Sequence, residues 1–255
     1  MVGQETRIRP WQWRLISIAL FIIAWQLAVD SGALAEYVLS SPWMIIEWTT
    51  EWHLSGDGIR ALGVTVVEAG AGYIIGIVAG ALVAAAFLWS RFLSDVFNPY
   101  MAVLGGLPLL VIAPFFIYAL GFGMASKIAS AAVLVFSLAF FNLYGGLRAI
   151  DPLYIQNVKL MGANAIRLAI DVYVPATAVW AMSTLRIGLG LALVGAIAGE
   201  FAGALDGVGL TMARARGVGA TEAVMGAILT VAVVAALLDS SLSRIERKYA
   251  AWTIF

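Results

Sequence analysis

Six long apolar runs constrain this chain more than any other feature of its sequence. A helix rises about 1.5 Å per residue, so it needs roughly 20 residues to cross the roughly 30 Å of hydrocarbon in a bilayer. The runs reach about this length, and they do not follow the period-two alternation that is typical of membrane strands. We therefore predict an all-α integral membrane protein with six transmembrane helices, at approximately residues 13–30, 62–88, 100–121, 126–147, 176–202 and 222–243.

The composition agrees with a membrane protein. Of the 255 residues 62% are hydrophobic and 12% are charged, whereas about 25% are charged in soluble domains. The Gly and Ala residues of 70–86 predict a span that packs closely against other helices. A net charge of zero gives no basic field for nucleic acid. With no cysteine and one histidine, His53, the chain offers no thiol chemistry and no histidine metal site.

The basic residues predict the orientation in the membrane. With the N-terminus inside, the cytoplasmic segments hold ten of the fifteen Lys and Arg residues and the outer segments hold four, while Arg186 lies within the fifth run. Basic residues concentrate on the cytoplasmic side, so both termini are expected there. The N-terminal run also fits a secretory signal cleaved near residues 33–35. Its length and its interruption at Trp25 and Gln26 favour a retained span.

Between the fourth and fifth runs lies a more polar segment. Asp151 followed by Pro152 is typical of a helix start, and Gly162 predicts a left-handed turn that ends this first helix. A second amphipathic helix is expected over 163–174, separated from the next span by Pro175. Two short helices joined by a bend would form a docking surface that is too polar to face lipid.

The same segment carries a family resemblance. Gly162, nine further residues and then "VYVP" at 172–175 resemble the cytoplasmic signature loop of the membrane subunits of bacterial ABC importers. That family typically has Glu-Ala-Ala ahead of the glycine, where this chain has Gln156, Asn157 and Val158. The similarity extends over nearly the whole chain, especially to the branch that imports nitrate, sulfonates, taurine and bicarbonate. Its other pieces are "SSP" at 40–42, "LPLLVIAPFFIYALGFG" at 107–123, Lys127, "GLRAIDP" at 146–152, "TLRIGLGLALVGAIAGEF" at 184–201, "GVG" at 207–209 and "ERKYAAW" at 246–252.

The resemblance implies a type I ABC importer-like permease in the prokaryotic inner membrane. Residues 1–255 would form a single transmembrane domain, with a cytoplasmic coupling loop at about 148–175 and an outer loop at about 203–221. It also implies a homodimer, two cytoplasmic ATP-binding subunits that grip residues 151–174, and an extracytoplasmic solute-binding protein. The residues expected to couple to the ATPase are Gln156, Asn157, Val158, Met161, Gly162, Ala163 and Pro175.

Energy is expected to come from these partners. The chain has no G-x-x-x-x-G-K-[ST] phosphate loop, because none of its three lysines follows a glycine. We therefore expect a non-catalytic subunit that binds no cofactor itself, with ATP and Mg held by the partner ATPases.

Charged residues and prolines inside the runs are candidates for a translocation path or gate. A charge at a helix centre costs about 2.5 to 3.5 kcal/mol on insertion scales, which singles out Arg186 and Glu200. Lying fourteen residues apart on one helix, they cannot pair with each other, so Arg186 could meet solute, line an inner gate, or pair with an acid or carbonyl on another helix. Glu200 is more typical of an interfacial or structural acid. Glu68 stands either at the outer mouth or on the surface, and Pro108 and Pro114 either bend the third span along the path or form a packing kink.

Two other functions are weighed against the importer subunit. A secondary transporter not coupled to ATP would show inverted repeats with broken helices, and no convincing repeat is found. A membrane enzyme would need clustered histidines, paired carboxylates or a nucleophile beside a base, and these are lacking. The expected cargo is a small polar solute, with an anion as one option.

Overall fold

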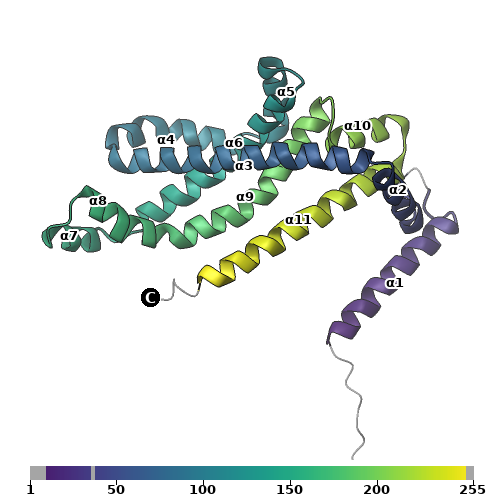
Figure 1. Cartoon of the computed structure of the whole chain (residues 1–255), viewed down its shortest axis with the longest axis horizontal. Helices are drawn as coiled ribbons and strands as arrows, with labels where there is room; N and C mark the ends of the chain where they lie inside the picture. Colours follow the sequence, from purple (N-terminus) through teal and green to yellow (C-terminus); the bar gives the residue numbers. More distant parts are fainter. Residues whose placement is uncertain (1–9, 36–37, 251–255) are drawn as a thin grey trace, which may run out of the picture. The chain divides into compact units, whose positions relative to one another are not determined.

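The computed structural model describes residues 10–35 and 38–250, and all regular structure within these ranges is helical (Figure 1). This confirms the all-α prediction. The elements are α1 (Pro10–Asp30), α2 (Pro42–Leu54), α3 (Asp57–Trp89), α4 (Arg91–Gly106), α5 (Leu109–Leu120), α6 (Met124–Arg148), α7 (Pro152–Leu160), α8 (Ala165–Leu168), the π-helical turn η1 (Ala169–Tyr173), α9 (Val174–Ala202), α10 (Val208–Val218) and α11 (Thr221–Ala250).

Five of these helical stretches are long and apolar enough to cross a membrane by themselves. They are Trp11–Asp30, Asp57–Trp89, Met124–Arg148, Ala165–Ala202 and Thr221–Arg244. They match five of the six predicted spans. The sixth is reached only when the bent pair α4 and α5 is counted as one span.

The predicted third span at 100–121 is not a single helix but is broken at one of the two prolines expected to bend or kink it. Two helices meet there at 104°, and the break falls at Leu107 and Pro108, which are both in extended conformation. Pro108 has no N–H to donate to a helix, and the residue before a proline is driven out of helical conformation. By contrast, Pro114 lies inside α5, which continues through it. Of the two prolines, Pro108 therefore breaks the span, and Pro114 is accommodated within a helix.

The chain divides into two compact units, and the larger comprises residues 59–210 and 231–255. At its centre α6 packs against α3 and α9. A Cβ atom added to Gly76 of α3 would lie 2.6 Å from the carbonyl oxygen of Ala132, and one added to Gly195 of α9 would lie 2.6 Å from the Cα of Ala131. Such close approach is possible only with glycine, which confirms the predicted tight packing of run 70–86.

Two apolar clusters fill the described core of this unit. One joins α3, α6 and α9 through Ala69, Ala131, Val135, Ala192, Leu193 and Ala196. The other joins α3, α4 and α6 through Ala84, Phe87, Met101, Phe140 and Tyr144. Small residues dominate the first cluster and aromatic rings the second, so the helices approach most closely at the first.

The smaller unit comprises residues 1–58 and 211–230. Ser41 caps α2 by accepting a hydrogen bond from the Met44 N–H, and Pro42 occupies the first turn of that helix. The start of α11 packs on α2, because a Cβ added to Gly226 would lie 2.6 Å from the ring of Trp48. Residues 1–9 of the predicted cytoplasmic N-terminus lie outside the described residues.

Candidate functional site

The segment between α6 and α9, residues 151–174, is called the coupling segment below. It begins as predicted: Oδ1 of Asp151 accepts a hydrogen bond of 2.8 Å from the Leu153 N–H, with Pro152 at the first helical position. Gly162 has a φ of +87°, which confirms the predicted left-handed turn. The Gly162 N–H bonds to Lys159 O and the Ala163 N–H to Val158 O, the pair of bonds that defines a Schellman cap.

The end of the coupling segment differs from its prediction. Pro175 does not separate the second short helix from the next span, because α8, η1 and α9 continue into one another over Ala165–Ala202. In the π turn the Val174 N–H donates to Ala169 O, five residues earlier. A proline is tolerated in the first turn after such an irregularity, because the N–H it lacks is not needed there.

Most of the coupling segment is exposed. None of the residues of α7 is buried, and Met161 at its end is 86% exposed. Leu168 and Val172 are buried and anchor the second half of the segment. Of the predicted coupling residues, Gln156, Asn157, Met161, Gly162 and Pro175 are exposed, and Val158 and Ala163 are half-buried. The segment also exposes five apolar residues, Leu153, Leu160, Met161, Ile166 and Ile170.

Arg186 pairs with an acid on another helix, which was one of its three predicted options. Its Nε donates to Oδ1 of Asp239 at 2.8 Å and its Nη2 to Oδ2 at 3.1 Å. A small cavity of about 290 Å³ adjoins the pair, lined also by Gly190, Leu193 and Leu238. Both charged side chains are 49% exposed although they lie within membrane-spanning helices. Charged side chains within membrane spans rarely face lipid.

Sequence reasoning missed Asp239, although a signal was available. Apart from Glu222 at its start, Asp239 is the one charged residue of the apolar run 222–243. An isolated acid in a span calls for a basic partner on another span, and Arg186 is one of the basic residues placed within a span. Which helices are neighbours could not be read from this pattern.

Three buried charges gather near the start of α6. Glu68 of α3, Lys127 of α6 and Glu200 of α9 are 2%, 1% and 0% exposed. The possibility of a surface-facing Glu68 is therefore wrong. Lys127 Nζ donates to Phe122 O at 2.7 Å and to Ser126 Oγ at 3.2 Å. Charge interactions link Lys127 to both acids, and the two acids interact through charge and a side-chain hydrogen bond. The expectation that the spans hold no paired carboxylates is therefore wrong.

Glu200 is the best satisfied member of this buried charge cluster. Its Oε1 accepts a hydrogen bond of 2.6 Å from the Thr65 hydroxyl, and its Oε2 accepts one of 2.6 Å from the Gly209 N–H. Thr65 Oγ1 in turn accepts from the Val208 N–H at 3.0 Å. Glu200 thus joins the first residues of α10 to α3 and α9, which is a structural role. The predicted places of Glu68 and Glu200 on a path or gate stay predictions.

Comparison with known proteins identifies the family. The family described as "Binding-protein-dependent transport system inner membrane component" matches residues 72–251. The putative aliphatic sulfonates transport permease protein SsuC of Bacillus subtilis (strain 168) is 28% identical over 242 residues, which cover 95% of this chain and 88% of that protein. A probable ABC transporter permease protein of Haemophilus influenzae is 25% identical over 241 residues, covering 94% and 97%.

The fold has a counterpart among solved structures. A chain of the inward-facing MetNI methionine ABC transporter superimposes with a TM-score of 0.58 at 21% identity, over 78% of this chain and 97% of that one. At this identity the likeness bears on the fold alone. The match over residues 72–251 confirms the resemblance seen in the sequence, and the chain belongs to the family of binding-protein-dependent transport system inner membrane components, as a multi-pass permease subunit of an ABC importer.

Proposed function

We propose that this permease works as a homodimer, driven by two cytoplasmic ATPase subunits that dock on the coupling segment, and that it imports a small polar organic solute delivered by an extracytoplasmic binding protein. The single observation that carries the proposal is the helical continuity of Ala165–Ala202. This stretch joins the exposed docking surface to the intramembrane Arg186. ATP and Mg would be held by the partner subunits, and the permease itself would perform no catalysis.

The coupling segment is suited to receive the movement of the ATPase subunits. Its exposed apolar residues offer a partner a surface, while Leu168 and Val172 fix its second half to the rest of the larger unit. From Ala165 to Arg186 the helix extends for roughly 31 Å at about 1.5 Å per residue. A displacement of the segment is therefore carried directly into the membrane by one element. Gln156, Asn157, Val158, Met161, Gly162, Ala163 and Pro175 are the residues we assign to this contact.

The pair of Arg186 and Asp239 suits a place on the solute path. Its two side chains are half exposed in the single subunit, and a two-fold dimer would present two such pairs to a shared axis. Opening of the pair during alternating access would free a guanidinium for an anionic group of the solute. Because the pair is neutral as a whole, it gives the path little charge of its own, and selectivity is left mainly to the binding protein.

The names of the relatives suggest the class of solute. SsuC of Bacillus subtilis is named for aliphatic sulfonates, and ThiX of Halalkalibacterium halodurans, 27% identical over 190 residues, for formylaminopyrimidine. RibX of Chloroflexus aurantiacus, 25% identical over 239 residues, is named for riboflavin. These are small organic molecules with polar groups. We propose the same broad class here, with sulfonates as the first compounds to test.

The docking proposal can be tested by copurification of a tagged permease with its ATPase. Met161→Glu places a charge in the centre of the proposed contact and should abolish copurification. Val218→Glu is the matched control, because Val218 is 81% exposed but lies at the end of α10, outside the coupling segment. It should leave ATPase binding intact. Undiminished ATPase recovery with Met161→Glu would overturn the docking site, and equal loss with Val218→Glu would show that the effect is not specific to it.

A further inference from the structure

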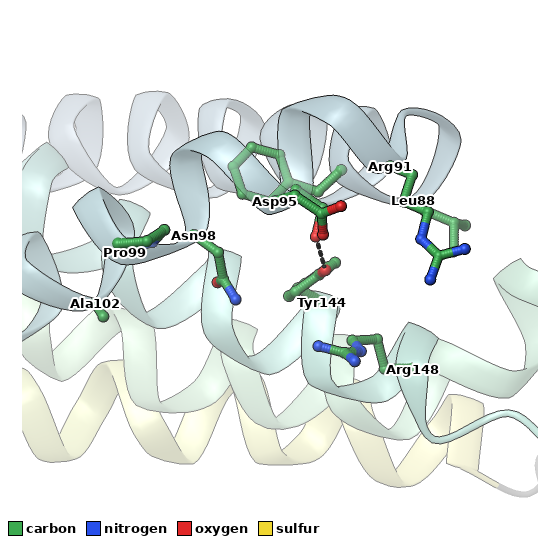
Figure 2. Close-up of a pocket in the computed structure, with 10 residues that line it drawn as sticks. Leu88, Arg91, Asp95, Asn98, Pro99, Ala102, Tyr144 and Arg148 are labelled. Carbon is green, nitrogen blue, oxygen red and sulfur yellow. Dashed lines mark hydrogen bonds between the residues drawn. The ribbon is translucent and has the colours of Figure 1, made fainter.

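A polar cavity of about 680 Å³ lies where α3 ends, α4 begins and α6 ends (Figure 2). It is separate from the coupling segment, the Arg186–Asp239 pair and the buried charge cluster. In Figure 2 Arg91 of α4 and Arg148 of α6 reach the cavity from different helices. Its lining also includes Ser94, Asp95, Asn98 and Tyr144.

The guanidinium groups of Arg91 and Arg148 have N–H donors available to a ligand. Among the described residues, no ion pair or hydrogen bond joins either guanidinium to Asp95 or to any other acceptor. Arg148 lies over the ring of Tyr144, with its Cζ 5.6 Å from the ring centre. The Tyr144 hydroxyl is itself fixed by a hydrogen bond of 2.5 Å with Ser94. The cavity therefore holds the Arg148 guanidinium, which lies over the Tyr144 ring, and the Arg91 guanidinium from another helix. The planar donor groups of both are available to a ligand.

Exposed aromatic side chains stand beside the cavity. Trp89 and Phe92 flank Arg91 in the chain and are each 71% exposed. Exposed aromatic rings at the end of a span are typical of the boundary between hydrocarbon and water. Arg148 is also the last residue of α6 and precedes Asp151 by three residues, so the cavity and the coupling segment lie at the same membrane face.

The charges of the cavity select its ligand. Arg91 and Arg148 against Asp95 leave a net charge of +1, and guanidinium groups match the geometry of phosphate oxygens. Asp95 and Asn98 would accept hydrogen bonds from hydroxyl groups attached to such a phosphate. We propose that this cavity binds a phosphate group between Arg91 and Arg148, carried by an anionic lipid headgroup such as that of phosphatidylglycerol. A free phosphate ester has the same chemistry and is distinguished by the experiment.

The experiment measures lipid binding to the purified full-length permease by native mass spectrometry. Phosphatidylglycerol and phosphatidylcholine with identical acyl chains are titrated separately, and soluble glycerol 3-phosphate is titrated in a third arm. We expect tighter binding of phosphatidylglycerol, weakened by about fivefold for each arginine changed in Arg91→Gln and Arg148→Gln. Arg14→Gln is the control, because it removes an exposed arginine from α1 without touching the cavity.

The outcomes separate clearly. Equal binding of the two lipids by the unaltered protein, or full phosphatidylglycerol binding by the double variant, would overturn the proposal. Tight binding of glycerol 3-phosphate that competes with the lipid would identify a free phosphate ester as the source. The double variant Arg91→Lys with Arg148→Lys keeps both charges but loses the paired donors of the guanidinium groups, so we expect it to retain part of the phosphatidylglycerol binding. Its partial binding distinguishes loss of the site from loss of the fold. None of these measurements depends on transport or on the ATPase.

Discussion

Arg186 on α9 and Asp239 on α11 face each other with two parallel hydrogen bonds, 2.8 Å and 3.1 Å long, inside helices that cross the membrane. The pair joins the helix that receives the coupling segment to the last helix of the chain. Neither partner is enclosed by its own subunit. The pair is therefore placed to respond both to the movement of α9 and to whatever occupies the adjoining space.

Removing one partner of this pair should slow import. We expect Arg186→Ala to reduce solute uptake by roughly tenfold while the subunit still accumulates, because the charge left behind is half exposed and can be hydrated. Uptake into proteoliposomes is the measurement. Arg60→Ala is the matched control, because Arg60 pairs with Asp206 at 2.8 Å but is 75% exposed, and such pairs contribute little. Normal uptake with Arg186→Ala would remove the pair from the path.

Exchanging the two charges separates pairing from solute contact. The combination of Arg186→Asp and Asp239→Arg keeps an ion pair but moves the guanidinium to α11. Recovery of uptake would show that the pair itself is what matters. If uptake stays low while the protein is folded, the guanidinium is needed on α9, as expected for direct contact with solute.

Substitution at Gly162 should uncouple ATP hydrolysis from transport. Its φ of +87° resists a side chain by about 1 to 2 kcal/mol, although a Cβ there would meet no atom within 4 Å. Gly162→Leu should therefore insert and dimerise, yet its ATPase should bind weakly or ignore the loaded binding protein. Gly162→Asn is the control, because asparagine tolerates this conformation. ATPase rates with and without binding protein give the answer, and full stimulation of Gly162→Leu would make the segment a mere connector.

The close contact of α3 with α6 should not tolerate a methyl group. We expect Gly76→Ala to destabilise the protein by about 1 to 3 kcal/mol, because its Cβ would lie 2.6 Å from backbone that cannot move aside. Gly70→Ala on the same helix has no atom within 4 Å of the new Cβ and should be neutral. Thermal unfolding in detergent compares the two variants. Equal melting temperatures would mean that the helices separate easily at this point.

The two buried acids should respond differently to amidation. Glu200→Gln puts an N–H₂ group where an oxygen accepts a hydrogen bond from Thr65 or Gly209. We therefore expect it to lower the free energy of unfolding by about 1 to 3 kcal/mol. Glu68→Gln should be neutral or stabilising, because the amide removes a like charge beside Glu200 and its N–H₂ group can donate the hydrogen bond that joins the two side chains. Melting temperatures measured side by side would refute this account if Glu68→Gln proved the more damaging.

The orientation can be read with single cysteines, since the natural chain contains none. Met161→Cys should react with a membrane-impermeant thiol reagent only after the inner face is opened, and Leu205→Cys should react in intact cells. The two positions are 86% and 76% exposed in the single subunit, so when the permease is produced without its ATPase access is set by the membrane and not by burial. Labelling of Met161→Cys from outside would reverse the predicted topology.

The features that the sequence predicted correctly are local ones. The spans follow from hydropathy, the helix start at Asp151 from its own capping oxygen, and the turn at Gly162 from the conformational freedom of one residue. Each depends on atoms that are close together along the chain. Such features are encoded in a few neighbouring residues.

The features that were missed depend on packing between distant residues. A proline allows either a kink or a break, and the sequence alone does not tell Pro108, which stands at a break, from Pro114, which lies inside a helix. The helix runs through Pro175 because the π turn before it places the proline where its missing N–H is not needed. The burial of Glu68 and the partner of Arg186 both require knowing which helices are neighbours.

The π turn at Ala169–Tyr173 has a geometric consequence for the whole subunit. A π turn amounts to one extra residue in an α-helix, and each residue of a regular helix corresponds to about 100° of rotation. The side chains of α8 are therefore rotated by about 100° around the helix axis, compared with the directions they would have if α8 and α9 formed one regular α-helix. If one residue of this turn were deleted, the apolar side of the coupling segment would swing around the helix axis while every intramembrane residue kept its neighbours. The direction in which the coupling segment faces is therefore fixed by a single surplus residue, and chain length at this point is as important as residue identity.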